Sequence, residues 1–392
     1  MDHADYIMMR APRPVLMLAA TQDFFDIQAT WVSFRYAKRL YSRMGFAGHV
    51  DLLENDAKHN YDKLQREGAV RWVSRWLIKQ DSDISEPRIE TITGDELRCT
   101  PRGQVMLMPG ARSVYDLNAQ RETQLAEQRK KLWAETPAPE LRDRIRRIAG
   151  IRKLAELPEP KVRQAGAAKH NGWAVEKLII LPEPGIFLPA LRFAPAQAQT
   201  APAVLYLHES DLAADANAGG AIEQFLKAGR TVLAVSLRGT GQTRQTAQGK
   251  FGSDLGQDWA DVFKAYLLGR SYVGMRAEDV LVCARYAAGT AGGGSVELVA
   301  VGNVGVPALH AAALEPQLFA SVKLSRTLAS WSSVAHARQT NNQLVNAVHA
   351  ALESYDLPDL AGMLGAKLTL DQPVDPLARP IQTDSQTARN PR

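Results

Sequence analysis

The chain has 392 residues, and at about 150 residues per domain this length predicts two to three domains. Hydrophobic residues make up 45% and charged residues 23%, which is ordinary globular usage and excludes a disordered or fibrous chain. Basic residues exceed acidic residues only slightly, 47 against 42, so the net charge is +5.

No apolar run reaches the ~18 residues that a membrane span needs, so we expect no membrane segment. The first residues, Met1–Asp5, are polar and acidic and do not resemble a secretory signal. Two cysteines, Cys99 and Cys283, exclude a disulfide scaffold and a Cys-based zinc site, but they do not fix the compartment.

Residues 1–80 are expected to alternate strands and helices. The continuous apolar run 14–20 predicts a strand that is buried on both faces. Apolar residues at helical spacing predict a helix over 29–45 and another over 61–78, with a short strand at 50–53 between them.

Residues 81–169 are expected to form a linker followed by charged helices. Turn signals at 81–87 and an apolar run at 104–108 predict a linker with one strand. Residues 111–165 have a helical period with a thin apolar stripe, broken by Pro137 and Pro139, so we expect helices that cover another element.

A basic stretch, 121–163, lies within these helices. Acidic residues are interleaved with its Lys and Arg, which is typical of a solvated helical face. A nucleic-acid surface is the alternative, but no zinc-finger spacing or aromatic RNA-binding signature accompanies it, so we expect no nucleic-acid partner.

Residues 170–380 alternate strands and helices again. The apolar runs predict strands at 175–180, 203–207, 231–237, 296–301, 321–324 and 367–370. Helices are expected between them at 219–228, 259–268, 276–287 and 306–314. Such alternation predicts a doubly wound α/β domain whose mostly parallel sheet is covered on both faces, followed by a polar tail at 381–392.

Two residues of the first segment follow its two predicted strands. Asp23 follows the first strand and His59 the second, which is the tail of the Ser…Asp/Glu…His order of α/β-hydrolases. In that chemistry the imidazole takes and returns the nucleophile's proton, and the carboxylate holds its tautomer. Taken singly, Asp23 could be a turn or capping residue and His59 a surface histidine, and Asp26 could cap the following helix.

The runs Asp2–Tyr6, Ala11–Leu16, Asp23–Phe25 and Lys58-His59 resemble the C-terminal end of bacterial acetyl xylan esterase-like α/β-hydrolases. These enzymes belong to the dienelactone hydrolase and prolyl-oligopeptidase-type group. The resemblance covers about the first 80 residues. It implies that Asp23 is the charge-relay acid and His59 the general base.

Residues 170–380 resemble the same fold a second time. The run 204–209 looks like the core strand that leads to an oxyanion loop, at His208 and Glu209. The run 236–241 looks like the Arg-Gly-x-Gly loop of the family, and 269–276 like the lead-in to the helix before the nucleophile strand. The nucleophile elbow then falls at 302–306.

The elbow departs from the family pattern. Gly-x-Ser-x-Gly is replaced by Gly302-Asn303-Val304-Gly305-Val306, so Val304 takes the place of the serine and has no nucleophilic atom. An acid exists after the last strand, at Asp371 or Asp375, but no histidine follows it. The second segment is therefore interpreted as a degenerate hydrolase domain.

Three functions follow from these patterns. The resemblance implies a carboxylic ester hydrolase of acetyl xylan esterase type, working through an acyl-enzyme, in which no nucleophile is recognisable; Ser325, after the strand at 321–324, is a speculative one. The alternative is a non-catalytic carbohydrate-binding or scaffolding pseudo-hydrolase. The third is a basic binding protein that uses residues 121–163.

The expected substrate is a small-molecule or polysaccharide ester, with no cofactor and no metal. The histidines His336 and His349 lie too far apart for one metal-binding helical face. The apolar strands of 1–80 need a partner, so we expect them to pack on the second domain or on another copy of the chain, as a homo-oligomer or by strand exchange. Relatives of this type are often exported.

Overall fold

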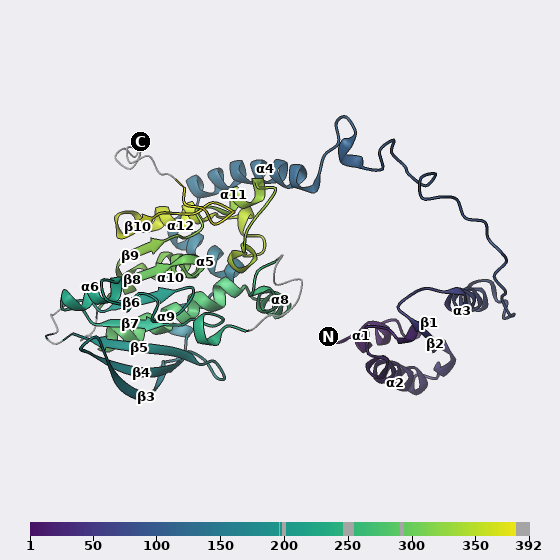
Figure 1. Ribbon diagram of the computed structural model, residues 1–392, viewed down its shortest axis with the longest axis horizontal. Coiled ribbons are helices and arrows are strands. Elements are labelled where there is room, and N and C mark those ends of the chain that lie inside the picture. The colour runs from purple at the N-terminus through teal and green to yellow at the C-terminus, as the bar shows by residue number, and fades with distance from the viewer. Residues whose placement is uncertain (196, 198–200, 246–254, 291–293, 382–392) are drawn as a thin grey trace. The chain divides into compact units, whose positions relative to one another are not determined.

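The structure is a computed structural model, and it describes residues 1–195, 197, 201–245, 255–290 and 294–381 (Figure 1). The chain divides into two compact units, unit 1 from Met1 to Gln104 and unit 2 from Val105 to Arg392. This division differs from the expected boundaries at 80 and 169. Most of the tail predicted at 381–392 lies outside the described residues.

Unit 1 is a small α/β unit around two parallel strands. Its elements are α1 (His3–Met8), β1 (Val15–Gln22), α2 (Ile27–Arg43), β2 (Val50–Lys58) and α3 (Lys63–Val73), with a π turn at Ser74–Ile78. The strands pair from Val15 opposite Val50 to Gln22 opposite Lys58. Both predicted strands and both predicted helices are confirmed, and β2 is longer than expected.

The core of unit 1 is small. Ala37, Tyr41 and Val50 are buried, and the Tyr41 hydroxyl donates a hydrogen bond to the Arg13 carbonyl at 2.8 Å. The expectation that the first strand is buried on both faces is wrong. Only Ala20 of β1 is buried, because β1 has a single neighbouring strand in the described part of the chain.

The strand predicted at 104–108 is not formed. Val105–Leu107 form a single 3-10 turn, and Met106 and Met108 are about half exposed. An apolar run alone does not make a strand when no neighbouring strand accepts its hydrogen bonds. The segment before it is held to α3 by ion pairs instead, from Arg66 to Glu86 and from Arg71 to Asp81.

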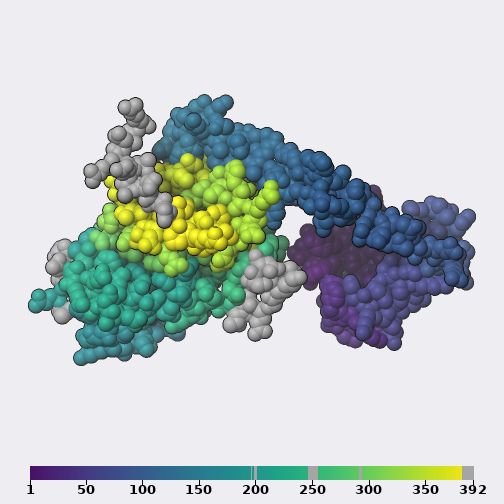
Figure 2. All heavy atoms as spheres, turned by 45° about the horizontal axis from the view of Figure 1, so that its top comes forward, coloured from purple at the N-terminus to yellow at the C-terminus, as the bar shows by residue number. Residues whose placement is uncertain are grey.

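As expected, the charged helices cover other elements, and they form an outer layer of unit 2 (Figure 2). They are α4 (Val114–Glu135) and α5 (Ala138–Ala149), interrupted at Pro137 as predicted. Their arginines are not all solvated. Arg129 donates to the Leu352 carbonyl at 2.6 Å and pairs with Glu122, and Arg146 pairs with Glu315 at 2.6 Å, so part of the basic stretch serves packing within unit 2.

Unit 2 contains an eight-stranded sheet in the order β10-β9-β8-β6-β7-β5-β4-β3. The strands are β3 (Lys161–His170), β4 (Trp173–Leu181), β5 (Leu188–Ala194), β6 (Val204–His208), β7 (Val232–Val235), β8 (Val296–Val301), β9 (Phe319–Ser325) and β10 (Leu368–Asp371). Strands β10, β9, β8, β6 and β7 run parallel, and β5, β4 and β3 continue the sheet antiparallel. The mostly parallel sheet is as predicted, and β3 and β5 are additions to the six predicted strands.

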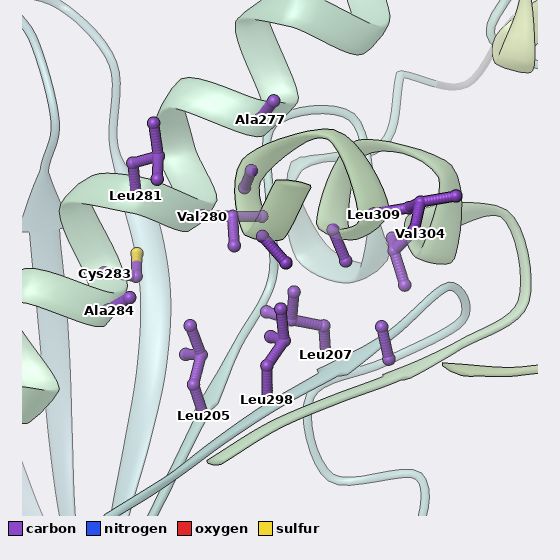
Figure 3. Close-up of a cluster of buried hydrophobic side chains, with 14 of the residues drawn as sticks. Leu205, Leu207, Ala277, Val280, Leu281, Cys283, Ala284, Leu298, Val304 and Leu309 are labelled. Atoms are coloured by element: carbon purple, nitrogen blue, oxygen red, sulfur yellow. The ribbon is translucent and has the colours of Figure 1, made fainter. Parts of the chain in front are cut away.

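Helices follow the parallel strands and complete the layers (Figure 1). They are α6 (Ala221–Lys227), α8 (Trp259–Leu267), α9 (Tyr272–Thr290), α10 (Gly305–Leu314), α11 (Trp331–His336) and α12 (Leu357–Leu364). Helices α9 and α10 pack on β6 and β8, and Figure 3 shows Leu205, Leu207 and Leu298 of these strands below them. Among the described residues no helix is both long and apolar enough to cross a membrane.

Buried ion pairs connect α9 to the loops around it. Arg238, after β7, donates from Nε and Nη2 to Asp279 at 2.8 and 2.6 Å, and their side chains are 12% and 0% exposed. Glu278 accepts from both Arg152 and Arg270. These pairs connect α9 to the loop after β7 and to the segments that contain Arg152 and Arg270.

Candidate active site

Asp23 and His59 meet at one edge of the two-stranded sheet of unit 1. Because β1 and β2 are parallel, the residues that follow them emerge side by side. The His59 Nδ1 lies 2.8 Å from Asp23 Oδ2. Asp23 and His59, which are separated along the chain by α2 and β2, are therefore in contact, as the sequence pattern predicted.

The surroundings of the pair suit an acid–base role. The Asp23 side chain is only 13% exposed, and its Oδ1 accepts the Phe25 N–H at 3.1 Å. Burial tends to raise the pKa of Asp23, but the hydrogen bonds from Phe25 and His59 outweigh it and lower the pKa below its usual value. Asp23 is thus an anion that orients the imidazole.

The opposite nitrogen of His59 is accessible. The side chain is 59% exposed, and Nε2 has no hydrogen-bond partner among the described residues. The Phe24 ring lies 4.5 Å from the imidazole, centroid to centroid. Asp26 caps α2 and Asp62 caps α3, so Asp23 does not cap a helix, although the bond that it accepts from the Phe25 N–H also closes a turn.

In unit 2 the turn between β8 and α10 is the predicted elbow, but Val304 does not stand at its apex. Val304 is buried in the core, and Figure 3 shows it beside Leu309. The left-handed residue of the turn is Gly302, with φ +82°. A nucleophile elbow holds its nucleophile in a strained backbone conformation, so Gly302, rather than Val304, occupies that place.

The space above Gly302 is filled by Glu209. A Cβ built on Gly302 would lie 2.2 Å from the Glu209 carboxyl carbon. The same carboxylate accepts the Asn303 backbone N–H at 2.9 Å. The N–H of the residue after the nucleophile is a usual oxyanion donor, and here an internal anion occupies it.

The expectation that backbone N–H groups at His208 and Glu209 bind an oxyanion is wrong for Glu209. The Glu209 backbone N–H donates to the Val301 carbonyl at 3.1 Å, so this amide is not free for a substrate. The His208 side chain instead takes part in a separate cluster with Ser210 and Asp215. Sequence reasoning did not single out these two residues.

A polar pocket of about 390 Å³ lies at this edge of the unit 2 sheet. Its wall includes residues of the loops after β6, β7, β8, β9 and β10, among them Ser210, Arg244, Asn303, Arg326 and Asn342. The carboxyl ends of strands in open α/β sheets are where such folds bind ligands. The pocket is thus in the position of a ligand site even though the elbow lacks a nucleophile.

Other predicted residues have local roles. The Ser325 hydroxyl donates to Asp371 Oδ2 at 3.1 Å, so these two residues join the ends of β9 and β10. Asp375 accepts the N–H groups of Leu377 and Arg379 within a turn. Across the described part of the chain, no group of three or more His, Cys, Asp or Glu side chains could hold a metal ion.

The sequence matches no protein-family model, and no curated protein matches it. Solved structures do match. A Bacteroides fragilis protein assigned to the acetyl xylan esterases has 15% identity and a TM-score of 0.50, and covers 68% of this chain and 77% of its own. Acetyl xylan esterase 1 from Thermoanaerobacterium has 15% identity and a TM-score of 0.37 over 62% of this chain and 89% of its own.

An acetyl xylan esterase from Paenibacillus matches with 14% identity and a TM-score of 0.34, over 60% of this chain and 78% of its own. At these identities the likeness concerns the fold. The match to the Bacteroides fragilis protein, with its TM-score of 0.50, and the sheet order described above show that the chain has the α/β-hydrolase fold.

Proposed function

We propose that the chain is a carboxylic ester hydrolase, and that the Asp23–His59 pair of unit 1 supplies its general base. The observation that carries this proposal is the 2.8 Å contact between the two side chains at neighbouring strand ends, with the far nitrogen of the imidazole open to solvent. The fold, which is similar to that of acetyl xylan esterases, supports it.

The chemistry follows from the geometry of the pair. His59 Nδ1–H donates to Asp23, so Nε2 carries the lone pair and can accept a proton from an attacking hydroxyl. The Asp23 anion stabilises the imidazolium that forms. The same imidazole then returns the proton to the leaving alcohol. By family resemblance, the proposed substrate is a short acyl ester of a carbohydrate.

The test is hydrolysis of p-nitrophenyl acetate by the full chain. We expect His59→Ala to lower kcat by about 10²–10⁴-fold, the usual contribution of a general base. Asp23→Asn should lower it as well, because the imidazole loses the anion that orients it.

His3→Ala is the matched control. His3 also lies beside a carboxylate, Asp2, at 3.3 Å, but at an almost fully exposed position. Its loss should leave turnover unchanged. Equal turnover by wild type and His59→Ala would remove His59 from the mechanism.

A second function is favoured for unit 2 by a different observation. With Glu209 seated on the Asn303 N–H and a glycine at the elbow, the turn has no nucleophile, while the polar pocket beside it remains. This supports a binding role for the pocket, toward a polar ligand such as a carbohydrate. Saturable binding of xylo-oligosaccharides in calorimetry, lost in Asn303→Leu, is the expected result. Absence of heat at millimolar sugar would contradict it.

A further inference from the structure

The loop after β6 brings a serine, a histidine and an aspartate of unit 2 together. The Ser210 hydroxyl lies 2.8 Å from His208 Nδ1, and His208 Nε2 lies 3.9 Å from Asp215 Oδ2. We propose that Ser210, His208 and Asp215 form a second hydrolytic centre, independent of the elbow and of the Asp23–His59 pair, which cleaves short-chain esters of small polar alcohols.

The hydrogen bonds around His208 determine which nitrogen carries the proton. The Ser210 backbone N–H donates to His208 Nδ1 at 3.1 Å, so Nδ1 must carry a lone pair. The Ser210 hydroxyl therefore donates to the same nitrogen. This is the arrangement in which a histidine can take the proton of a serine.

The other side of the ring faces the acid. Since Nδ1 is the acceptor, Nε2 carries the hydrogen. It lies 3.9 Å from Oδ2 of Asp215, which is within ion-pair distance but too long for a hydrogen bond, and this oxygen also accepts the hydroxyl proton of Tyr206. Burial and the bond to Asp215 raise the pKa of Tyr206, so Tyr206 stays a donor. The Asp215 carboxylate lies where it can stabilise the imidazolium once Ser210 has given up its proton.

The cluster is partly sheltered on its inner side and open at the serine. The side chains of His208 and Asp215 are 18% and 35% exposed, whereas Ser210 is exposed and contributes to the wall of the 390 Å³ pocket. A carbonyl carbon bound in that pocket can therefore reach the hydroxyl without a change in the loop.

Donors for the developing oxyanion are present in the same pocket. Arg244 lies next to Ser210, held by a 2.9 Å hydrogen bond to the Glu209 carbonyl. Asn303 accepts from Asn346 Nδ2 with its Oδ1, which leaves its own amide N–H groups for the pocket. These donors replace the Asn303 backbone N–H, which already donates its hydrogen bond to Glu209.

The proposed reaction balances as two acyl transfers. Ser210 Oγ attacks the ester carbonyl while its proton moves to His208 Nδ1, and the alcohol leaves with that proton. Water then attacks the acyl-serine, giving one proton to His208. Collapse releases the carboxylic acid and returns the proton to Ser210 Oγ.

The pocket also defines the substrate class. Its volume of about 390 Å³ suits a ligand of sugar size. Most of the described residues in its wall are polar, and the apolar ones among them are Val304, Val374 and Ala378. A long acyl chain would find few apolar contacts there. Short acyl groups on polar alcohols fit this wall.

The experiment is covalent labelling of the full chain with a fluorophosphonate, followed by peptide mapping. We expect one adduct, on Ser210, that is absent in Ser210→Ala. His208→Gln should slow the labelling by about 10²-fold or more, because the base is lost. In the His59→Ala background, where the unit 1 pair no longer contributes turnover, Asp215→Asn should lower the remaining kcat for p-nitrophenyl acetate by about tenfold or more with little change in KM, as expected of a positioning residue.

Two controls separate this proposal from its alternatives. Ser332→Ala, on helix α11 away from the pocket, should be labelled like wild type. His59→Ala should also be labelled on Ser210 at the wild-type rate, so that loss of one centre does not imply loss of the other. Ser210→Cys should react with iodoacetamide faster than the same variant carrying His208→Gln, which tests the pair without relying on the serine.

The outcomes are distinct. An adduct on Ser210 that depends on His208 upholds the second centre, even if His59→Ala keeps full turnover and the unit 1 proposal fails. No adduct on Ser210, or an adduct that forms equally fast in His208→Gln, overturns the proposal of a second centre. The Ser210–His208 contact would then be only part of a turn.

Discussion

Units 1 and 2 differ in size and in the chemical groups that follow their strands. Unit 1 has two parallel strands, a small core and an acid–base pair in contact, Asp23 and His59. Unit 2 has eight strands, a large core and a polar pocket, but its elbow has Gly302 with Glu209 seated above it. The Asp23–His59 pair lies in unit 1, whereas the larger sheet and the polar pocket lie in unit 2.

The two units also differ in what supports the features at their strand ends. In unit 2 the sheet order, the elbow turn and the strand-end pocket do not depend on a serine at Gly302, because packing of α9 and α10 on β6 and β8 supports them. In unit 1 the contact between Asp23 and His59 needs only two paired strands. The following predictions test where each unit draws its stability and its chemistry.

The largest effect is expected at the buried ion pair of unit 2. Arg238→Ala leaves Asp279 fully buried without its cation, which should lower the free energy of unfolding of unit 2 by about 3–5 kcal/mol. Hydrogen exchange read by mass spectrometry, with peptides from α9 and β7, measures this loss separately from unit 1.

Arg71→Ala in unit 1 is the matched control. Arg71 also makes two ion pairs, with Asp81 and Asp83, but it is about half exposed. Exposed pairs contribute little, so its removal should leave protection of the unit 1 peptides nearly unchanged. Equal losses in the two variants would contradict the view that unit 2 alone depends on buried charges.

A pH effect of about 3 kcal/mol is expected in unit 2 from His310. Its Nδ1 donates to the Val306 carbonyl and its Nε2 accepts from the Tyr355 hydroxyl, within the core. Burial lowers the pKa of His310 from 6.5 to about 4, although the bond to Val306 opposes this. His310 therefore becomes protonated below pH 6.5 in the unfolded chain but only near pH 4 in the folded chain. The free energy of unfolding should fall by about 3 kcal/mol as the pH decreases through this interval.

Urea unfolding at pH 7, 6 and 5, followed by hydrogen exchange of α10 peptides, measures how steeply the free energy of unfolding changes with pH. His310→Gln should be less stable at pH 7, because the core hydrogen bonds are disturbed, but its stability should vary less with pH. An unchanged slope in His310→Gln would assign the acid sensitivity of unit 2 to other groups.

A serine at the elbow should destabilise unit 2 rather than restore it. Gly302→Ser places a Cβ 2.2 Å from the Glu209 carboxyl carbon and gives a left-handed backbone to a residue that resists it. Strain and overpacking together should cost about 2 kcal/mol. Thermal unfolding of Gly302→Ser and of Gly302→Ser with Glu209→Ala checks this, since the second substitution should recover part of the loss. A wild-type midpoint in the single variant would show that the turn has room for a serine.

Much of the fold of both units is predictable from the sequence for a simple reason. Continuous apolar runs such as 204–207 and 296–301 are typical of strands buried on both faces, and both form central strands. The edge strand β3 was missed because most of its side chains are exposed. The run at 104–108 was wrongly predicted as a strand because a local pattern does not reveal whether a neighbouring strand exists.

The candidate sites were predictable only where their residues follow strands. Asp23 and His59 do so, and the structure brings them together. Val304 was misplaced because counting from the glycine pattern ignores backbone conformation. The signal available was Gly302 itself, since glycine adopts a positive φ at no steric cost. The contact of Ser210 with His208 was missed because two residues this close in sequence usually form a turn.

The smallest expected effect completes the comparison, because acid should affect unit 1 later than unit 2. The pKa of Glu86 is lowered chiefly by its bond to Arg66, and the pKa of Asp23 is lowered by Phe25 and His59 against the effect of burial. Groups with a lowered pKa contribute stability that is present above their unfolded pKa, near 4, and is lost as the pH falls below it. Exchange of β1 and β2 peptides should therefore be level from pH 7 to 5, after correction for the intrinsic rate, and rise only below about pH 4. Loss of protection in unit 1 between pH 7 and 5, in step with α10, would mean that the two units do not respond to acid through separate groups.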